Sequence, residues 1–329
     1  MKFYLRPDRS PTYYNIAQCL MKKNWHKTRL SFLAHFSEKV FNYDKNISRQ
    51  LEYKHFLAKL VQYSCPEVMP ETICINDSSW KLSLDKLGQT HNQDKTAWIL
   101  KPALLNNGQE IHIFNHISEI KSHYIQNNRM GGEHILQHYI TTPHLLKGPN
   151  NTGHKYSLRM FMVLTNYQGA FLYPHGYFNI AVTPYDANNF YDLSGHITNE
   201  HLQEDRVNVI QIPSFKYDLF KPIYPKIKSI LTQVIFALEK KYPSMFLNAN
   251  VNANKKLAIF GVDFIVDVDQ RVWLIEANHG PCFPITQTHD LQASLYADFW
   301  KNLIEEFVQP IGKKTPVEQI QYTIFDRLD

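Results

Sequence analysis

The feature that most constrains the fold of this chain is the stretch Phe260–Gly280, FGVDFIVDVDQRVWLIEANHG. It contains two apolar runs with the aliphatic and aromatic composition of β-strands, separated by polar residues as in a hairpin. Each run nevertheless carries an acid, Asp263 in the first and Glu276 in the second. An ionised carboxylate in an apolar strand costs free energy unless a cation or hydrogen-bond donors compensate it. The stretch therefore predicts a β-hairpin that presents two acids for a purpose other than packing.

The register of this hairpin decides whether the two acids meet. With the turn centred between residues 269 and 270, Asp263 lies opposite Glu276, and Gly261 lies opposite Asn278. Opposed Cβ atoms lie about 5 Å apart, where two negative charges repel each other. A bridging cation removes that repulsion, and two carboxylates with an amide oxygen suit Mg²⁺ rather than zinc. Gly261 would leave room for the ion and a ligand. The alternative interpretation is an edge hairpin with both acids in water.

Composition is that of an ordinary globular protein. With 329 residues, of which 44% are hydrophobic, the chain can bury a sizeable core in one large domain or in several smaller ones. The net charge of +5 is too small to favour a nucleic-acid-binding or membrane-surface protein, so we expect neither partner. We also expect no signal peptide, because the N-terminus lacks an apolar core. The four cysteines show no zinc-like spacing, which favours reduced thiols in a cytoplasmic protein.

Helix and strand patterns alternate irregularly along the chain. Helical spacing of apolar residues occurs at 51–63, 117–124, 224–240 and about 290–308. Strand-like runs occur at 71–76, 96–104, 110–114, 134–140, 156–165 and 170–182. Because strands follow one another directly in the second half, this order predicts an α+β fold with antiparallel sheets. A doubly wound parallel sheet is not expected.

The segment 148–157, GPNNTGHKYS, is close to a phosphate-binding P-loop without meeting its chemical requirements. His154 stands where lysine is needed, and Lys155 is displaced by one position. A strand is expected to follow, whereas the P-loop holds phosphate with backbone amides at a helix N-terminus. No G-x-G-x-x-G follows a strand either. We therefore expect neither a P-loop nor a Rossmann cofactor site.

Six further segments resemble, in the same order as the hairpin, the tubulin–tyrosine ligase-like family of the ATP-grasp superfamily. They are LEYKHFLAKL at 51–60, WILKP at 98–102, LQHYI at 136–140, HKYSLRMFMV at 154–163, FLYPHGYF at 171–178 and GHITN at 195–199. The resemblance implies an ATP-grasp fold, in which two α+β subdomains clasp ATP beside a small N-terminal domain. The expected limits are 1–50 for the N-terminal region, 51–142 for the central subdomain and 143–329 for the C-terminal subdomain with the hairpin.

The resemblance also implies which residues meet ATP and Mg²⁺. The expected cofactor-binding residues are Lys54, Lys101, Gln137, His138, Tyr139, Ile140, Lys155, Asn199 and Asp263. The expected metal ligands are Asp263, Glu276 and Asn278, and the expected catalytic residues are Arg159, Lys155 and Glu276. In this set the two lysines of the central subdomain contact phosphates, and residues 137–140 form a hinge against adenine. Because Arg159 lies inside an apolar strand, we also expect a partner for its charge.

The chemistry implied is that of an ATP-dependent ligase that joins a carboxylate to an amine. ATP would phosphorylate the carboxylate, and an amine would attack the acyl phosphate to leave an amide. The expected partners are ATP, an amino acid and a protein or peptide acceptor. No covalent enzyme nucleophile is needed, and Cys282 is expected to be a packing thiol. The same motifs leave open an ATP-grasp phosphotransferase and a nucleotide-binding module that has lost catalysis.

Three positions depart from the family pattern. Ser157 stands where the family usually has aspartate, Asn179 where it has arginine, and His138 where lysine is common. Ser157 and Asn179 are therefore candidate substrate-side residues. Because the substrate side departs while the ATP side is retained, tubulin stays open as the acceptor but is not the one expected.

Overall fold

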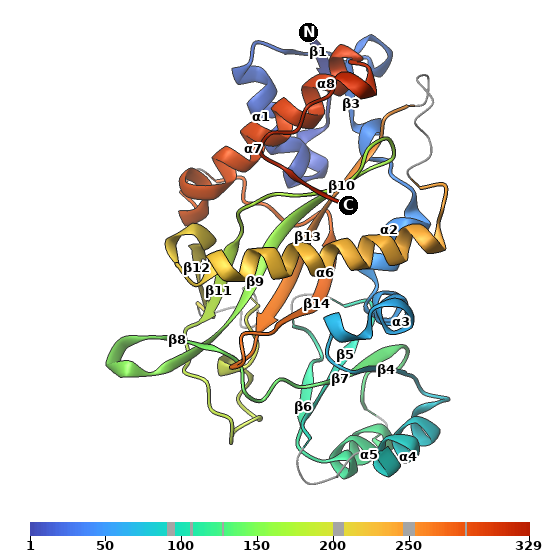
Figure 1. The fold of residues 1–329 in the computed structure, drawn as a ribbon, viewed down its shortest axis with the longest axis vertical. Helices are drawn as coiled ribbons and strands as arrows, with labels where there is room; N and C mark the ends of the chain where they lie inside the picture. The colour runs from blue at the N-terminus through green and yellow to red at the C-terminus, as the bar shows by residue number, and fades with distance from the viewer. Residues whose placement is uncertain (91–95, 106–107, 127, 200–206, 246–253, 287) are drawn as a thin grey trace.

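The structure is a computed structural model that describes residues 1–90, 96–105, 108–126, 128–199, 207–245, 254–286 and 288–329. These residues form three β-sheets that follow one another along the long axis of the molecule (Figure 1). The helices are α1 Pro11–Lys22, α2 Lys45–Glu52, α3 Lys54–Ser64, α4 Trp80–Thr90, α5 Ile117–Ile125, α6 Phe220–Lys241, α7 Ala297–Leu303 and α8 Gln309–Lys313. The strands are β1 Lys2–Tyr4, β2 His26–Lys27, β3 Phe36–Ser37, β4 Thr72–Ile75, β5 Trp98–Pro102, β6 His112–Phe114, β7 His134–His138, β8 Leu145–Lys147, β9 Gly153–Thr165, β10 Gly169–Leu172, β11 Tyr177–Ala181, β12 Val209–Pro213, β13 Leu257–Val266, β14 Val272–His279 and β15 Asp326–Leu328.

The N-terminal region and the C-terminal helices pack together. A small parallel sheet in the order β2-β1-β3 lies beside α1 at one end of the molecule (Figure 1). Phe3 and Phe36 share an apolar core with Trp300 and other residues of the C-terminal helical segment. That segment continues through π-helical turns on both sides of α7 and ends at Lys313, beyond the predicted end. Segments far apart in the sequence thus stabilise each other at this end.

The smaller of the other two sheets is antiparallel, in the order β4-β7-β5-β6. Side chains on alternate positions of its strands point to opposite faces. On one face, Trp98, Leu100 and Leu136 pack in an apolar cluster with residues of α4 and α5. The opposite face carries the buried polar residues Lys101 and Gln137. One face of this sheet therefore packs in the core, and the other carries polar side chains that line the candidate site.

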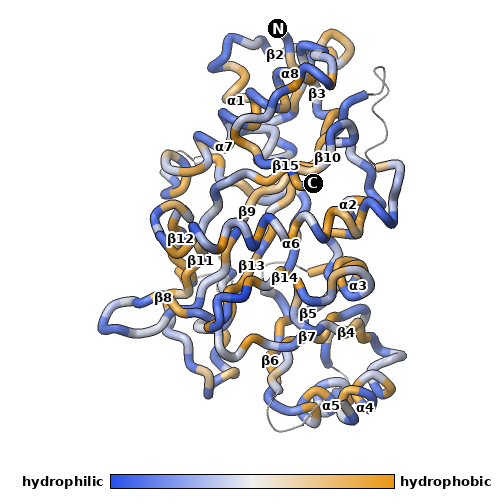
Figure 2. Tube along the Cα trace, viewed as in Figure 1, coloured by the Kyte–Doolittle hydropathy of each residue, from blue (hydrophilic) through white to orange (hydrophobic). Residues whose placement is uncertain are grey.

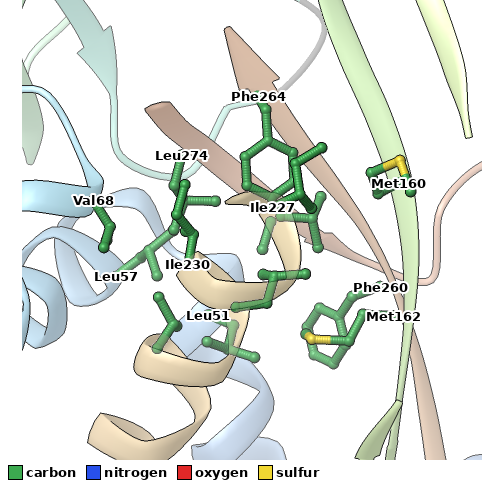
Figure 3. Close-up of a cluster of buried hydrophobic side chains, with 14 of the residues drawn as sticks. Leu51, Leu57, Val68, Met160, Met162, Ile227, Ile230, Phe260, Phe264 and Leu274 are labelled. Atoms are coloured by element: carbon green, nitrogen blue, oxygen red, sulfur yellow. The ribbon is translucent and has the colours of Figure 1, made fainter. Parts of the chain in front are cut away.

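The largest sheet is built around β9, which has 13 residues and pairs with β8, β10, β11 and β13, all antiparallel. β13 pairs in turn with β14. The even-numbered residues of β9 from Leu158 to Leu164 are buried in a core with Phe260, Phe264 and residues of α6 (Figure 3). Hydrophilic and hydrophobic residues alternate along α6, as expected for a helix with one face on a sheet (Figure 2). Because successive side chains of β9 point to opposite faces of the sheet, burial of the even-numbered ones leaves the odd-numbered ones available to form a site.

The odd-numbered residues of β9 divide into two groups on the other face. Phe161 and Val163 pack in the core shared with the C-terminal helices. Lys155, Ser157 and Arg159 line a cavity instead. One long strand therefore joins the apolar core to the candidate site.

The prediction of antiparallel sheets is confirmed for the two larger sheets, but two predicted elements are wrong in detail. The helix predicted at 51–63 is two helices, because Tyr53 is extended and its N–H ends α2 while its carbonyl begins α3. The strand predicted at 170–182 is two strands, β10 and β11. Pro174, which has no N–H to donate, lies in the gap between them. The predicted domain limits stay predictions; α2 crosses residue 50, and residue 142 lies between β7 and β8.

None of the helices in the described ranges combines the length and apolar character needed to span a bilayer.

Gly176 tests the close approach that positions Arg159. A Cβ at Gly176 would lie 2.0 Å from the main-chain oxygen of Arg159, so the backbone of β9 or β11 must move. We expect Gly176→Ala to lower the free energy of unfolding by at least about 1–3 kcal/mol in urea denaturation. Gly131→Ala is the matched control, because its Cβ would meet only the tip of the Asp77 side chain, at 3.0 Å. Equal stability of the two variants would contradict this role.

Candidate functional site

A cavity of about 380 Å³ is lined by residues of the two larger sheets. Its size falls within the range of small-molecule sites. Every site residue predicted from the sequence lines it: Lys54, Lys101, Gln137, His138, Tyr139, Ile140, Lys155, Ser157, Arg159, Asn179, Asn199, Asp263, Glu276 and Asn278. The structure therefore brings all of these residues together, although their individual roles stay predictions.

The acid pair lies in the predicted register. Asp263 pairs with Glu276 and Gly261 with Asn278 across β13 and β14. The turn, however, is not centred where the sequence analysis placed it. Val266 pairs with Val272, and the register shifts after Asp263, so a β-bulge restores the predicted pairing at the acids.

Arg159 is the partner of the acid pair on the neighbouring strand. It pairs in register with Asp263, and its Nε and one terminal nitrogen donate to the two carboxylate oxygens at 2.5 and 2.7 Å. A Cβ at Gly261 would lie 3.0 Å from the side chain of Arg159. The expectation that Gly261 leaves room for an ion is therefore wrong. The space beside this glycine is taken by the guanidinium of Arg159. The expected partner for Arg159 is confirmed.

Glu276 is close to donors from α3 and from its own strand, β14. Lys54 at the start of α3 has its Nζ 3.4 Å from a Glu276 oxygen and donates to the carbonyl of Leu105 at 2.7 Å. The Asn278 amide donates to Glu276 at 3.2 Å and to Asp263 at 3.4 Å. The break at Tyr53 places Lys54 at the first position of α3.

Two buried lysines complete the charged part of the cavity. Lys101 Nζ donates to Gln137 Oε1 at 2.9 Å, and Lys155 Nζ donates to the Tyr139 hydroxyl at 2.8 Å. The Tyr139 hydroxyl donates to His196 Nδ1 at 2.8 Å, because the other ring nitrogen, Nε2, carries the proton that is donated to the carbonyl of Asn189 at 2.9 Å. Within the described ranges, neither lysine forms an ion pair.

A profile of the tubulin-tyrosine ligase family matches residues 33–317, which include every residue of the cavity named above. The chain belongs to this family.

Curated members of the tubulin-tyrosine ligase family are distant from this chain. Tubulin glycylase 3C of Tetrahymena thermophila is 24% identical over 213 residues, which cover 59% of this chain and 19% of the relative. Probable tubulin–tyrosine ligase PBY1 of Saccharomyces cerevisiae is 24% identical over 281 residues, which cover 71% and 36%. Inactive polyglycylase TTLL10 of Homo sapiens is 24% identical over 215 residues, which cover 56% and 31%. The chain thus spans less than two fifths of each of these relatives, and one of them is named inactive.

The two acids of this family member differ in how strongly they hold a proton. Burial alone would raise the pKa of Glu276, but the charges of Lys54, Lys101 and Arg159 outweigh burial and lower it below its ordinary value. Burial raises the pKa of Asp263 above its ordinary value against the opposing charge of Arg159, and the charge of Glu276 adds to this rise. Glu276 is therefore fully ionised at neutral pH, whereas Asp263 depends on Arg159 to remain so.

The buried lysines hold their protons weakly. Burial lowers the pKa of Lys101 to about 8, and the charge of Lys54 contributes to this shift. Burial lowers the pKa of Lys155 to about 7, with a further contribution from Lys101. No carboxylate of the described residues forms an ion pair with either ammonium, so an anion in the cavity would restore its affinity for the proton.

The predicted hinge, residues 137–140, was expected to meet adenine largely through its backbone groups, but some of these groups already have partners in the protein. The N–H groups of His138 and Tyr139 already donate to the carbonyls of Glu71 and Ala97, at 2.7 and 2.9 Å. Among the described residues, no acceptor is found for the N–H of Ile140. Of these three residues, Ile140 is therefore the one whose N–H has no acceptor in the described part of the chain, and its role in a hinge stays a prediction.

The donor set at the hairpin fits Mg²⁺ better than a softer metal. The described residues contain no group of three or more histidine, cysteine or acidic side chains that could hold a metal ion. What the hairpin offers is two carboxylates, which are hard oxygen ligands, while the Asn278 side chain turns its NH2 group toward both acids and would have to reverse to add its amide oxygen. Arg159 holds both oxygens of Asp263, so an ion would share this carboxylate with the guanidinium.

Several lining residues were not identified from the sequence. Ile99 and Ile265 contribute apolar surface, while Thr198 and Gln211 contribute polar groups. Gln211 could have been found by extending the strand pairing from β9, which carries Arg159, through Asn179 on β11 to the residue opposite it on β12. The prediction that Cys282 is a packing thiol is wrong, because Cys282 is exposed and lines the cavity.

Arg159→Met tests the charge balance in the metal-free protein. The variant leaves Asp263 buried without its partner, so the pKa of Asp263 rises further above that of an unfolded aspartate. We expect a loss of about 3–5 kcal/mol in the free energy of unfolding at pH 7.5. Protonation of Asp263 relieves the unpaired charge, so the deficit relative to wild type should shrink by pH 5.5 in urea titrations.

The double variant Arg159→Met/Asp263→Asn is the control for this experiment. It removes both charges, so we expect a smaller deficit that changes little between the two pH values. A deficit of Arg159→Met that is the same at pH 7.5 and pH 5.5 would show that Asp263 does not depend on this partner.

Proposed function

We propose that this chain is an ATP- and magnesium-dependent ligase that forms an amide bond, adding an amino acid to a protein or peptide acceptor. The observation that carries the proposal is the excess of buried positive charge in the cavity. Four cationic side chains, Lys54, Lys101, Lys155 and Arg159, face two acids. Burying cations without counter-ions is costly, so the lining is suited to a polyanion such as a triphosphate.

The ends of the cavity suit the parts of a nucleotide. Ile99 and Ile265 supply apolar surface on the two sheets for a flat base, and the N–H of Ile140, for which the described residues provide no acceptor, supplies a donor. Lys54 and Lys101 would hold the phosphates between base and hairpin. Cytoplasmic location and the nucleotide roles of the remaining hinge residues stay predictions.

The hairpin would hold the metal ion beside the phosphates. Asp263, Glu276 and Asn278 are the residues that would bind Mg²⁺, which when bound neutralises charge on the phosphate oxygens. Glu276 is suited to this role because the surrounding lysines keep it ionised.

In the proposed reaction the γ-phosphoryl group passes from ATP to a substrate carboxylate, which gives ADP and an acyl phosphate. The amine then attacks the acyl carbon, and phosphate leaves as the amide forms. Both reacting groups are anions, so the barrier contains a large repulsive contribution. Arg159 and Lys155 would lower it by holding positive charge where the carboxylate and the phosphoryl group meet. Because several relatives are named for tubulin, a tubulin tail is one acceptor to test.

Nucleotide binding should take up protons. Near pH 8 both Lys101 and Lys155 are partly neutral in the free protein, and bound phosphates favour their ammonium forms. We expect uptake of about one proton when Mg²⁺ and a non-hydrolysable ATP analogue bind at pH 8, and weaker binding as pH rises further. Calorimetry in buffers of different ionisation enthalpy measures both.

The variant Lys155→Met should reduce this proton uptake, whereas Lys147→Met, at an exposed lysine of β8, should not. Binding without proton exchange, and of equal affinity from pH 7 to pH 9, would contradict the phosphate assignment.

Catalysis is tested by Glu276→Gln, which keeps the side-chain shape and removes the charge. We expect ADP release to fall by at least about 100-fold with a cooperative fold retained. Glu239→Gln on the exposed face of α6 is the matched control and should keep wild-type turnover.

The products of the wild-type enzyme identify the reaction class. Lysate proteins and metabolites are incubated with the enzyme, Mg-ATP and mixed amino acids, and then examined by mass spectrometry. The proposal predicts the added mass of an amino-acid residue, dependent on Glu276. Addition of phosphate to a hydroxyl would indicate a phosphotransferase, and nucleotide binding without turnover would indicate an inactive module; either result overturns the proposal.

A further inference from the structure

A row of uncharged polar side chains crosses the largest sheet beside the charged residues of the cavity. Gln211 on β12 pairs with Asn179 on β11, and Asn179 pairs with Ser157 on β9. All three line the cavity. Arg159 lies two residues further along β9 on the same face, about 7 Å away. The three side chains of this row, Ser157, Asn179 and Gln211, thus form a corner of the cavity that contains no charged side chain.

The hydrogen bonds within this corner leave some of its polar groups free. Gln211 Nε2 donates to Asn179 Oδ1 at 3.0 Å, and the Thr198 hydroxyl donates to Ser157 Oγ at 2.8 Å. In the described ranges, no protein acceptor is found for Asn179 Nδ2 and no donor for Gln211 Oε1. Asn179 is 8% exposed, so this amide is almost fully buried and its open side faces the cavity.

The free groups are complementary to an amide. Exchanging the oxygen and nitrogen of both side chains reverses the hydrogen bond but again leaves one donor and one acceptor free. A carboxylate carries acceptors alone, so it would face the free acceptor of the pair. A carboxamide or a peptide group carries both a donor and an acceptor and can satisfy both groups.

The cations nearest in sequence are directed elsewhere. Lys155 and Arg159 flank Ser157 on the same face of β9, but Lys155 donates to Tyr139 and Arg159 to both oxygens of Asp263. Neither is positioned as a fixed partner for an anion in this corner.

We infer that the corner formed by Ser157, Asn179 and Gln211 binds an uncharged amide group of the substrate and disfavours a carboxylate. This inference deepens the proposed function, on which it rests, by naming the class of the substrate group. The amide has two chemical sources, the side chain of an amino acid such as glutamine and the main chain of a peptide acceptor.

The test is calorimetric titration of the protein, with and without Mg²⁺ and a non-hydrolysable ATP analogue. The probes are glutamine, glutamate and N-acetylglycine N-methylamide, an uncharged peptide-bond compound. We expect at least one amide probe to bind about tenfold or more tightly than glutamate. Binding of glutamine alone assigns a side-chain amide, and binding of the peptide compound assigns a main-chain amide.

Two variants separate recognition from folding. Asn179→Arg adds a positive charge and should reverse the preference toward glutamate. Gln211→Leu removes the free acceptor at a less buried position and should reduce the amide preference without a large change in melting temperature. Equal or tighter binding of glutamate by wild type, no binding of either amide probe, or an unchanged preference in Asn179→Arg would each overturn the inference.

Binding of the ATP analogue and binding of the amide probes test two different claims. Failure of the ATP analogue to bind contradicts the proposed function. Nucleotide binding without an amide preference contradicts only the assignment of this corner.

Discussion

The bidentate contact between Arg159 and Asp263 is the interaction on which the rest of the site depends. It places a guanidinium across two strands, so that β9, β13 and β14 present Arg159, Asp263 and Glu276 side by side. Without it, two opposed carboxylates would lie side by side in the cavity and repel each other. The acid pair therefore does not need a metal ion to be tolerated, because the protein supplies its own cations. An ion that binds here adds to a charge balance that already exists.

The alternation of β9 connects this balance to the stability of the fold. Its even-numbered side chains from Leu158 to Leu164 share a buried core with α6, and odd-numbered side chains divide between the C-terminal core and the cavity. A shift of β9 by one residue would exchange core for site along the whole strand. The packing of β9 against its neighbouring strands therefore also fixes the backbone positions from which its charged side chains enter the cavity. Lys54 reaches the same cavity from α3, and Lys101 reaches it from the four-stranded sheet. The site therefore depends on both the four-stranded sheet with α3 and the largest sheet.

Much of this arrangement could be predicted from the sequence, for identifiable reasons. The pairing of Asp263 with Glu276 was predicted from a turn centred between residues 269 and 270, and it is correct because a β-bulge offsets the different position of the turn. The β-bulge between the turn and the acids, and the left-handed conformation of Gln270, leave no clear signal in the sequence. The break at Tyr53 was missed because helical spacing continues across it. The contacts of Lys155 with Tyr139, and of Tyr139 with His196, join residues far apart in the chain, so no local pattern reveals them.

The central claim is that the excess positive charge of the cavity holds the phosphates of a nucleotide. A crystal structure of the protein with Mg²⁺ and a non-hydrolysable ATP analogue tests it most directly. The account predicts the triphosphate against Lys54, Lys101 and Lys155, the base beside Ile140, and the ion at Asp263 and Glu276. A nucleotide bound elsewhere, or a cavity without nucleotide at saturating concentration, would contradict it.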